Sequence, residues 1–274
     1  MEKHIQELLQ KIKANKKYKS LADEIILKEI KNYLKSYPKA NDITIIKQVR
    51  ARLHRLYSSY QTKKKKKRDD YLEELKIALK NNKSIKEITN KLLLSTLSTT
   101  ERLSDYQYIY SEIFKITGEP NSIADLGAGL SPCSFPFMNL KKIKYYAYDI
   151  DKDDINFLNK YFKIMKKEIK GKAAIFDLRD LSKISSLPST DIVFLFKVID
   201  LIDDKIKISE RLIKNLFNQD KCKFIVASFA TKTLTRKSMN FPKRKGFEKM
   251  LTRNNLKFKS FKTPNEIFYV ISQI

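Results

Sequence analysis

The sequence predicts a two-part protein, in which a helical region precedes an α/β domain built on a mainly parallel sheet. In residues 1–118, apolar residues such as Ile5, Leu8 and Ile12 recur at the three- and four-residue spacing of helices. From residue 119 to residue 274, short β-branched runs alternate with helical stretches, which is the pattern of strands joined by crossover helices. We therefore expect a helical domain over 1–118 and an α/β domain over 119–274.

The same patterns give the individual elements. The expected helices centre on Ile5–Ile12, Leu21–Leu34, Ile43–Tyr60, Tyr71–Leu79, Ile85–Leu94 and Ser104–Ile116. The expected strands are Ser122–Asp125, Lys144–Asp149, Ala173–Phe176, Asp191–Phe196, Lys223–Ser228 and Ile267–Ile271. A block of like charge, Lys63–Arg68, interrupts the helical region, and we expect it to be a flexible, solvated loop.

The chain carries a strong excess of positive charge. Its 57 lysine and arginine residues outnumber 31 acidic residues, which gives a formal net charge of +26. Such an excess favours a polyanionic partner through phosphate neutralisation, with nucleic acid preferred over an anionic membrane or compositional bias. No apolar run reaches about 18 residues, so we expect no membrane span. Two distant cysteines, Cys133 and Cys222, and an N-terminus unlike a secretion signal indicate a reducing, cytoplasmic compartment.

A glycine turn follows the first predicted strand. Gly127, Ala128 and Gly129 come directly after Asp125 and Leu126, where the backbone can approach a ligand closely at the carboxyl end of the strand. Dinucleotide sites need a third glycine to open a helix terminus to pyrophosphate, but position 132 is proline. S-adenosylmethionine has no phosphate, so the turn favours this cofactor over NAD.

Two further strand ends carry acidic residues of the predicted cofactor site. Asp149, followed by Ile150, ends the second strand, where its carboxylate can accept hydrogen bonds from ribose hydroxyls. Asp177 and Leu178 follow the third strand, where a carboxylate can accept from an adenine amino group and the leucine can pack on the ring.

Several segments together resemble one family, the aminoglycoside-resistance 16S ribosomal RNA methyltransferases. The resemblance lies in Leu97–Leu103, Asp125–Pro132, Phe135–Met138, Tyr146–Asp151, Asp191–Lys197, Ala227–Leu234 and Arg52–Tyr60. It implies a Rossmann-like class I methyltransferase with a seven-stranded, mainly parallel sheet, which transfers a methyl group from S-adenosylmethionine to N7 of a guanine in the decoding-site region of the 30S subunit. This sequence departs from the family at Ala128, Ser131 and the segment Lys237–Asn240, where the family commonly has cysteine, asparagine and Lys-Gly-Met-Glu.

The resemblance also implies roles for single residues. Arg102 looks like the arginine that pairs with the cofactor carboxylate, as a guanidinium fork suits a carboxylate. Asp125, Gly127, Ala128 and Gly129 would lie along the methionine part of the cofactor. Phe196 and Lys197 would face the methyl group and the incoming base, where they position rather than take a proton.

Guanine N7 has a free lone pair and no proton to lose, so its methylation needs alignment and no general base. The sequence offers no evident base, since His4 and His54 both fall in the helical region. Methylation of a ribose 2′-hydroxyl remains an alternative, because Lys197 could handle the proton that this hydroxyl loses. The sequence is also compatible with methylation of a transfer RNA or of another ribosomal RNA position, and with an RNA-binding protein that has lost catalysis.

Two groups of basic residues are expected to bind RNA. They are Lys47, Arg50, Arg52, His54 and Arg55 in the third helix, and Lys232, Arg236, Lys237 and Arg244 after the fifth strand. Basic groups spread over so large a surface suit an assembled small ribosomal subunit better than a short stem. We expect a monomer, with no obligate protein partner and no metal.

Overall fold

A seven-stranded sheet forms the centre of the molecule. The computed structural model describes residues 2–57, 62–202, 207–232, 237 and 244–273. The strands are β1 (Ser122–Leu126), β2 (Ile143–Asp149), β3 (Ile169–Ile175), β4 (Thr190–Phe196), β5 (Cys222–Ala230), β6 (Leu256–Lys262) and β7 (Glu266–Gln273). Their order is β3-β2-β1-β4-β5-β7-β6. Strands β1 to β5 pair in parallel, whereas β7 pairs antiparallel with both β5 and β6. The predicted Rossmann-like, mainly parallel seven-stranded sheet is confirmed.

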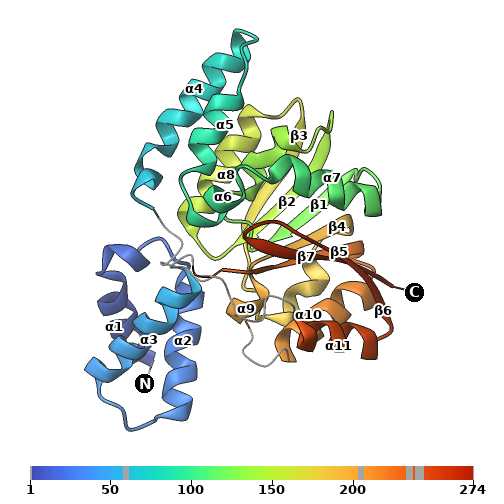
Figure 1. The fold of residues 1–274 in the computed structure, drawn as a ribbon. Coiled ribbons are helices and arrows are strands. Elements are labelled where there is room, and N and C mark those ends of the chain that lie inside the picture. Colours follow the sequence, from blue (N-terminus) through green and yellow to red (C-terminus); the bar gives the residue numbers. More distant parts are fainter. Residues whose placement is uncertain (1, 58–61, 203–206, 233–236, 238–243, 274) are drawn as a thin grey trace.

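Helices cover both faces of the sheet (Figure 1). One layer contains α4 (Arg68–Lys80), α5 (Lys86–Leu93), α6 (Leu97–Arg102), α7 (Tyr106–Thr117) and α8 (Lys152–Ile164). The other contains α9 (Ile199–Ile202), α10 (Lys207–Asn218) and α11 (Lys245–Arg253). Short 3-10 helices join these elements at Lys16–Tyr18, Lys63–Lys67, Ser131–Phe137 and Leu181–Ser186.

The helical region divides into two parts that pack differently. Helices α1 (Glu2–Lys13), α2 (Asp23–Ser36) and α3 (Asp42–Leu56) form a separate bundle around their own apolar cluster (Figure 1). Helices α4, α5 and α7 instead share one hydrophobic cluster with the sheet, where the fully buried ring of Tyr110 stacks on Phe194 of β4. Residue 118 thus marks the change from helices alone to alternating strands and helices. The boundary between the two hydrophobic clusters lies earlier, near residue 57.

The bundle is joined to the sheet domain by backbone hydrogen bonds at the end of β2. The amide of Ala22 donates to the carbonyl of Ile150 at 3.1 Å, and the amide of Lys152 donates to the carbonyl of Ser20 at 2.8 Å. These bonds flank an isolated antiparallel bridge between Leu21 and Asp151. The segment that follows Asp149 is therefore held on one side by the bundle.

The block Lys63–Arg68 is not a flexible loop, and the prediction of one is wrong. Lys63–Lys67 forms a 3-10 helix that leads into α4. Lys65 lies 3.1 Å from carboxylate oxygens of both Asp151 and Asp154, and Arg68 is buried 2.6 Å from Asp154. The two carboxylates at the start of α8 draw these cations inward, because a buried carboxylate requires a paired charge.

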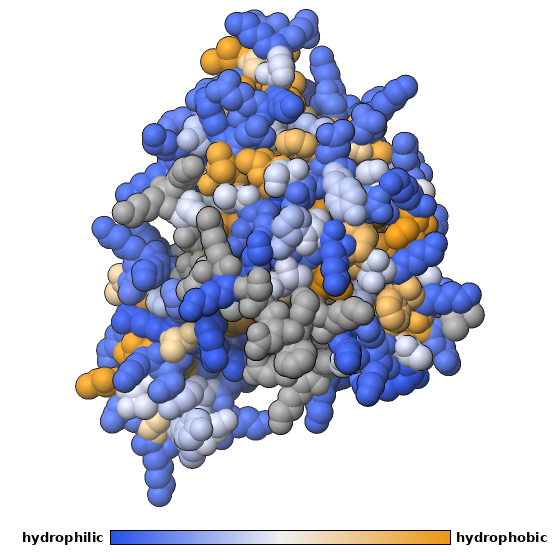
Figure 2. Space-filling view, in the orientation of Figure 1, coloured by the Kyte–Doolittle hydropathy of each residue, from blue (hydrophilic) through white to orange (hydrophobic). Residues whose placement is uncertain are grey.

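The face drawn in Figure 2 is mostly hydrophilic among the described residues, with hydrophobic residues in small separate groups. Among the described residues, no helix is long and apolar enough to cross a membrane.

Candidate cofactor and RNA site

A pocket lies where β1 to β4 end. It contains about 910 Å³ of space that no atom fills, part of it open to solvent. Eight of the predicted site residues line it: Gly127, Gly129, Asp149, Ile150, Asp177, Leu178, Phe196 and Lys197. Three others, Arg102, Asp125 and Ala128, are buried but lie outside the lining. The strand ends thus bring most of the predicted residues together.

Gly127 forms a wall of this pocket that admits no side chain. Its φ angle is +82°, in the left-handed region that glycine adopts without strain. A Cβ atom built at this position would lie 2.3 Å from Cγ1 of Val198, which also lines the pocket. The backbone of the turn is fixed as well, since the amides of Gly127 and Ala128 both donate to the carbonyl of Tyr148, at 2.8 and 2.9 Å.

Asp149 has one acceptor position left for a ligand. Its Oδ2 accepts from the amide of Gly129 at 2.8 Å, and its Oδ1 accepts from the amides of Ile150 and Asp151 at 2.7 and 3.3 Å. A carboxylate offers about four acceptor positions, so one remains on Oδ2. Burial and the nearby Asp154 raise the pKa of Asp149 to about 6. The carboxylate is placed to accept from a hydroxyl group within the pocket.

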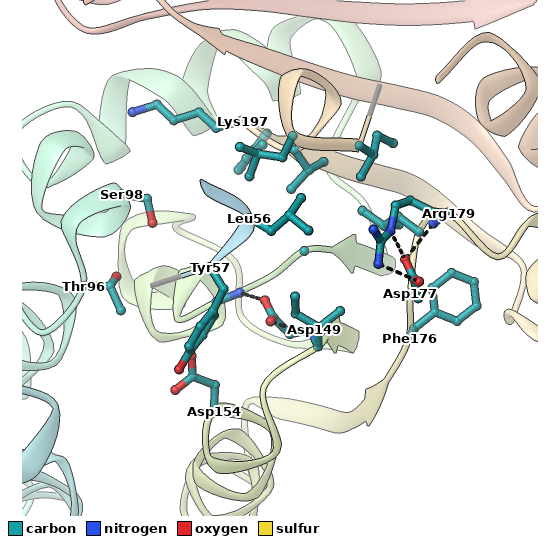
Figure 3. A pocket seen from close by; sticks show the side chains of 18 residues that line it. Leu56, Tyr57, Thr96, Ser98, Asp149, Asp154, Phe176, Asp177, Arg179 and Lys197 are labelled. Carbon is teal, nitrogen blue, oxygen red and sulfur yellow. Dashed lines mark hydrogen bonds and ion pairs between the residues drawn. The ribbon is translucent and has the colours of Figure 1, made fainter. Parts of the chain in front are cut away.

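Asp177, in contrast, already has a full set of partners. Its Oδ1 accepts from the amide and Nε of Arg179 at 3.0 and 2.9 Å, and its Oδ2 accepts from Nη2 of Arg179 and Nζ of Lys28 at 3.1 and 2.8 Å (Figure 3). Burial opposes ionisation, but these cations hold the pKa of Asp177 below its usual value. Binding of an adenine amino group by this carboxylate therefore requires one cation to move.

Arg102 pairs with a carboxylate of the protein itself. Its Nε and Nη2 donate to the two carboxylate oxygens of Glu266 at 2.7 and 3.1 Å, and both side chains are almost fully buried. Although burial opposes ionisation of Glu266, Arg102 and then Lys197 hold its pKa below the usual value. Glu266 takes two of the five N–H donors of Arg102 and the hydroxyl of Tyr106 lies beside the guanidinium as well, so at most part of the donor set is left for a second anion among the described residues.

Phe196 and Lys197 follow one another at the end of β4 but point to different surroundings. The ring of Phe196 lies 5.0 Å from the guanidinium carbon of Arg102 and lines the pocket. The ammonium of Lys197 lies 2.5 Å from Glu101 and 3.2 Å from Glu266, and Figure 3 shows this side chain pointing away from Leu56 and Asp149. Lys197 has a φ angle of +58°, which turns the chain sharply after the strand. The structure thus uses the ammonium of Lys197 in a buried ion cluster.

Asp125 lies below the glycine turn. Its Oδ2 accepts from the hydroxyl of Tyr145 at 2.8 Å, while Oδ1 has no hydrogen-bond partner among the described residues. Burial raises the pKa of Asp125 to about 7. Asp125 is therefore tied to β2 through Tyr145 and carries one oxygen without a hydrogen-bond partner among the described residues.

The predicted RNA-binding residues of α3 do not all face solvent freely. Lys47, His54 and Arg55 are exposed. Arg50 donates to the carbonyl of Lys11 at 2.6 Å, and Arg52 pairs with Glu29 at 2.7 Å.

The predicted RNA-binding residues after β5 are only partly described. Arg244 pairs with Asp200 at 2.8 Å and stacks on Phe229, while Lys232 is half-buried and Lys237 exposed. Arg236 and the departures at residues 238–240 lie outside the described residues.

Sequence reasoning missed several residues of the site. Leu56 and Tyr57, at the end of α3, reach the pocket beside Asp149 (Figure 3). The hydroxyl of Tyr57 donates to Asp151, which also accepts from Ser20 at 2.6 Å. The bundle therefore supplies part of the pocket wall, which no local pattern of α3 reveals.

Among the described residues, the lining of the pocket includes no histidine or cysteine. The described part of the chain also has no group of three or more histidine, cysteine and acidic residues able to hold a metal ion. What the lining offers is a glycine wall, acceptors at Asp149, and aromatic and aliphatic surface at Phe176, Leu178 and Phe196. This set of groups suits a polar ligand that has a flat ring.

Known proteins resemble this chain along almost its full length. A relative from Proteus mirabilis named "16S rRNA (guanine(1405)-N(7))-methyltransferase" is 26% identical over 285 residues, covering 99% of this chain and 98% of the relative. A relative of the same name from Micromonospora echinospora is 24% identical and covers 83% of this chain and 82% of its own.

A solved structure shows the same fold. It is described as 16S rRNA methyltransferase RmtF in complex with S-adenosyl-L-homocysteine, and it covers 100% of both chains with a TM-score of 0.81 at 20% identity. The profile of the family described as Ribosomal RNA methyltransferase (FmrO) matches residues 14–270. This match covers far more than half of the sequence, and the chain therefore belongs to the FmrO family of ribosomal RNA methyltransferases.

Proposed function

We propose that this protein methylates N7 of guanine 1405 in the 16S ribosomal RNA of the assembled 30S subunit, with S-adenosylmethionine as methyl donor. The observation that carries the proposal is the match to the Proteus mirabilis enzyme of that name, which extends over 99% of this chain. A transfer RNA target has weaker support, since the relative named tRNA (guanine(37)-N(1))-methyltransferase covers only 34% of the chain.

The pocket fits the proposed cofactor. S-adenosylmethionine supplies an electrophilic methyl group on a sulfonium centre. Asp149 would accept a ribose hydroxyl at its remaining position, and Leu178 would pack on the adenine. Gly127 would let the backbone approach the methionine part, because a side chain there has no room beside Val198. The remaining donors of Arg102, whose guanidinium lies 5.0 Å from the ring of Phe196, suit the cofactor carboxylate.

The lining also fits the proposed reaction. Nucleophilic attack by guanine N7 releases no proton, so a pocket without histidine or cysteine is sufficient for it. Phe196 contributes an aromatic ring, held between Phe194 and Arg102, to the pocket wall that the incoming base would meet. Lys197, fixed between Glu101 and Glu266, sets the direction of the chain after β4. These residues act by alignment. We propose that a monomer acts, in the cytoplasm where ribosomes are found.

Cofactor affinity is expected to fall at acid pH. The buried Asp149 carboxyl has its pKa raised from 3.8 to about 6, so it is ionised and able to accept above this value and becomes protonated below it. Binding of S-adenosylhomocysteine should be about tenfold weaker at about pH 5 than at about pH 7, since affinity falls tenfold for each pH unit below the pKa. Isothermal titration calorimetry measures this directly.

Two variants test whether the pH dependence of S-adenosylhomocysteine affinity comes from Asp149. Asp149→Asn should bind more weakly and lose the pH dependence, whereas Asp125→Asn should keep it, because the pKa of Asp125 is raised to about 7 but its side chain lies outside the pocket lining. An unchanged pH profile in Asp149→Asn would contradict the proposed role.

The exposed cations of α3 should contribute to RNA affinity through phosphates. Replacing Lys47 and Arg55 together with glutamine should lower the salt dependence of 30S binding by about two units in the slope of log affinity against log salt, because each phosphate contact adds about one. The matched control replaces Lys257 and Lys259, two exposed lysines of β6, and should leave the slope as in the wild type. Equal slopes for the two double variants would contradict the proposed contact between α3 and RNA.

The function is tested by methyl transfer to unmodified 30S subunits and to naked 16S ribosomal RNA. We expect the subunit to be the better substrate. Equal transfer to both would contradict the part of the proposal that concerns the assembled subunit.

A further inference from the structure

A continuous series of ion pairs runs from the exposed face of α3 to the cofactor pocket. Nε of Arg52 lies 2.7 Å from one carboxylate oxygen of Glu29 in α2. The other oxygen of Glu29 accepts from Nη1 of Arg179. Arg179 then holds Asp177 through Nε and Nη2, at 2.9 and 3.1 Å (Figure 3). We refer to Arg52, Glu29, Arg179 and Asp177 as the ionic chain.

The ends of the ionic chain lie in different environments. The side chain of Arg52 is 49% exposed, on the helix that also carries the exposed Lys47 and Arg55. Arg179 and Asp177 both line the pocket. Between them the side chain of Glu29 is only 1% exposed, so its charge is held in the interior between two arginines. A change at the surface therefore has a physical route to the pocket wall.

Burial of the Glu29 carboxylate is unfavourable unless cationic side chains pair with it. A carboxylate removed from water loses several kcal/mol of hydration, on the order of magnitude known for buried ions, and two guanidinium partners offset this loss. Glu29 fixes the one guanidinium nitrogen of Arg179 that Asp177 does not engage. All three guanidinium nitrogens of Arg179 are therefore engaged, and this fixes the positions of Arg179 and Asp177 in the pocket wall.

We propose that Glu29 is a positioning residue for the cofactor pocket, and that the ionic chain couples the RNA-facing side of α3 to cofactor binding. The inference rests on the proposed function in taking an S-adenosyl compound as the ligand and α3 as a helix that faces RNA. A phosphate that approaches Arg52 competes with Glu29 for the guanidinium of Arg52. RNA docking therefore weakens the pair between Arg52 and Glu29 and changes how Glu29 holds Arg179. Coupling of this kind is reciprocal, and cofactor binding must change RNA affinity by the same factor.

The first experiment measures binding of S-adenosylhomocysteine to the free protein by calorimetry. Glu29→Gln keeps the shape of the side chain but removes its charge, and we expect about tenfold weaker binding, which is within the range of ordinary coupling energies. The matched control is Glu24→Gln in the same helix, whose half-exposed carboxylate lies 3.6 Å from Lys183 and should have no effect. Equal affinities for wild type and Glu29→Gln overturn the positioning role.

Steady-state kinetics separate positioning from a general loss of structure. Glu29→Gln should raise the KM for S-adenosylmethionine about tenfold and change kcat by less than about threefold, since Glu29 touches no reacting group. A loss of kcat at unchanged KM, in a protein with the wild-type circular dichroism spectrum, contradicts the inference.

The second experiment uses Arg52→Gln, which removes the exposed end of the chain and leaves the buried pairs in place. Affinity for 30S subunits is measured with and without saturating S-adenosylhomocysteine. The wild type should show a change of at least about fivefold between the two conditions, and Arg52→Gln should reduce it to less than about twofold. Should Glu29→Gln not fold, this variant decides the question alone.

Arg55→Gln is the control for the second experiment. Arg55 is an exposed cation of the same helix. It should lower 30S affinity equally in both conditions and so retain the coupling. Coupling that persists in Arg52→Gln, or is absent from the wild type, overturns the proposal. Label on a nucleotide other than guanine 1405 would instead overturn the proposed target and leave this inference intact.

Discussion

Glu266→Gln is expected to destabilise the protein by about 3–5 kcal/mol, because the change leaves buried cations without their counter-charge. Glu266 is completely buried and accepts from Arg102, from Lys197 at 3.2 Å and from Ser228 at 2.7 Å. A neutral amide balances neither cation and presents donors toward them. Urea unfolding followed by circular dichroism measures the loss.

The size of this effect depends on burial, and an exposed pair provides the comparison. Glu73→Gln removes the partner of Lys76 at 3.5 Å, where both side chains are about two-thirds exposed, and should cost less than about 1 kcal/mol. A Glu266→Gln loss as small as that of Glu73→Gln would show that the ion cluster behind β4 contributes little to stability.

Gly127→Ala is expected to weaken S-adenosylhomocysteine binding by at least about tenfold. The added Cβ meets Cγ1 of Val198 at 2.3 Å, and overpacking of this kind costs about 1–3 kcal/mol. Either the glycine turn or Val198 must move, and both are walls of the pocket. The left-handed φ of +82° adds strain of about 1–2 kcal/mol.

Two further variants separate the clash from the strain. Gly118→Ala has a similar φ of +73° with no atom within 4 Å of the new Cβ, so it should lose stability but keep cofactor affinity. Val198→Ala removes the clashing methyl group, and the double variant with Gly127→Ala should recover part of the affinity. Wild-type affinity in Gly127→Ala would contradict the placement of the cofactor against this turn.

The strand ends of the pocket were predictable because local patterns specify them. Buried apolar runs that end in Asp149 or Asp177, and the glycines after Asp125, fix where strands stop, and parallel strands bring their carboxyl ends to one edge. Strand β6 was missed because its few apolar residues, Leu256, Phe258 and Phe261, are separated by lysines and a serine and do not keep a strict alternation. Its pairing with β7 is what stabilises it.

Long-range ion pairs account for what the sequence did not reveal. Arg102 and Glu266 are 164 positions apart, and Arg179 and Glu29 are 150 apart. No local spacing in the sequence connects such residues. Arg102 was therefore assigned to the cofactor carboxylate, and its pairing with Glu266 was not foreseen. The inward turn of Lys65 and Arg68 was missed for the same reason, since Asp151 and Asp154 lie in another element.

The proposed reaction is tested by transfer of a labelled methyl group from S-adenosylmethionine to 30S subunits, followed by mapping of the labelled nucleotide. N7-methylguanine is located by reductive strand cleavage and primer extension. We predict a single label, on N7 of guanine 1405, and no further label on subunits already methylated by the Proteus mirabilis enzyme. Label on another nucleotide, or none from a folded protein that binds S-adenosylhomocysteine, would contradict the proposed function.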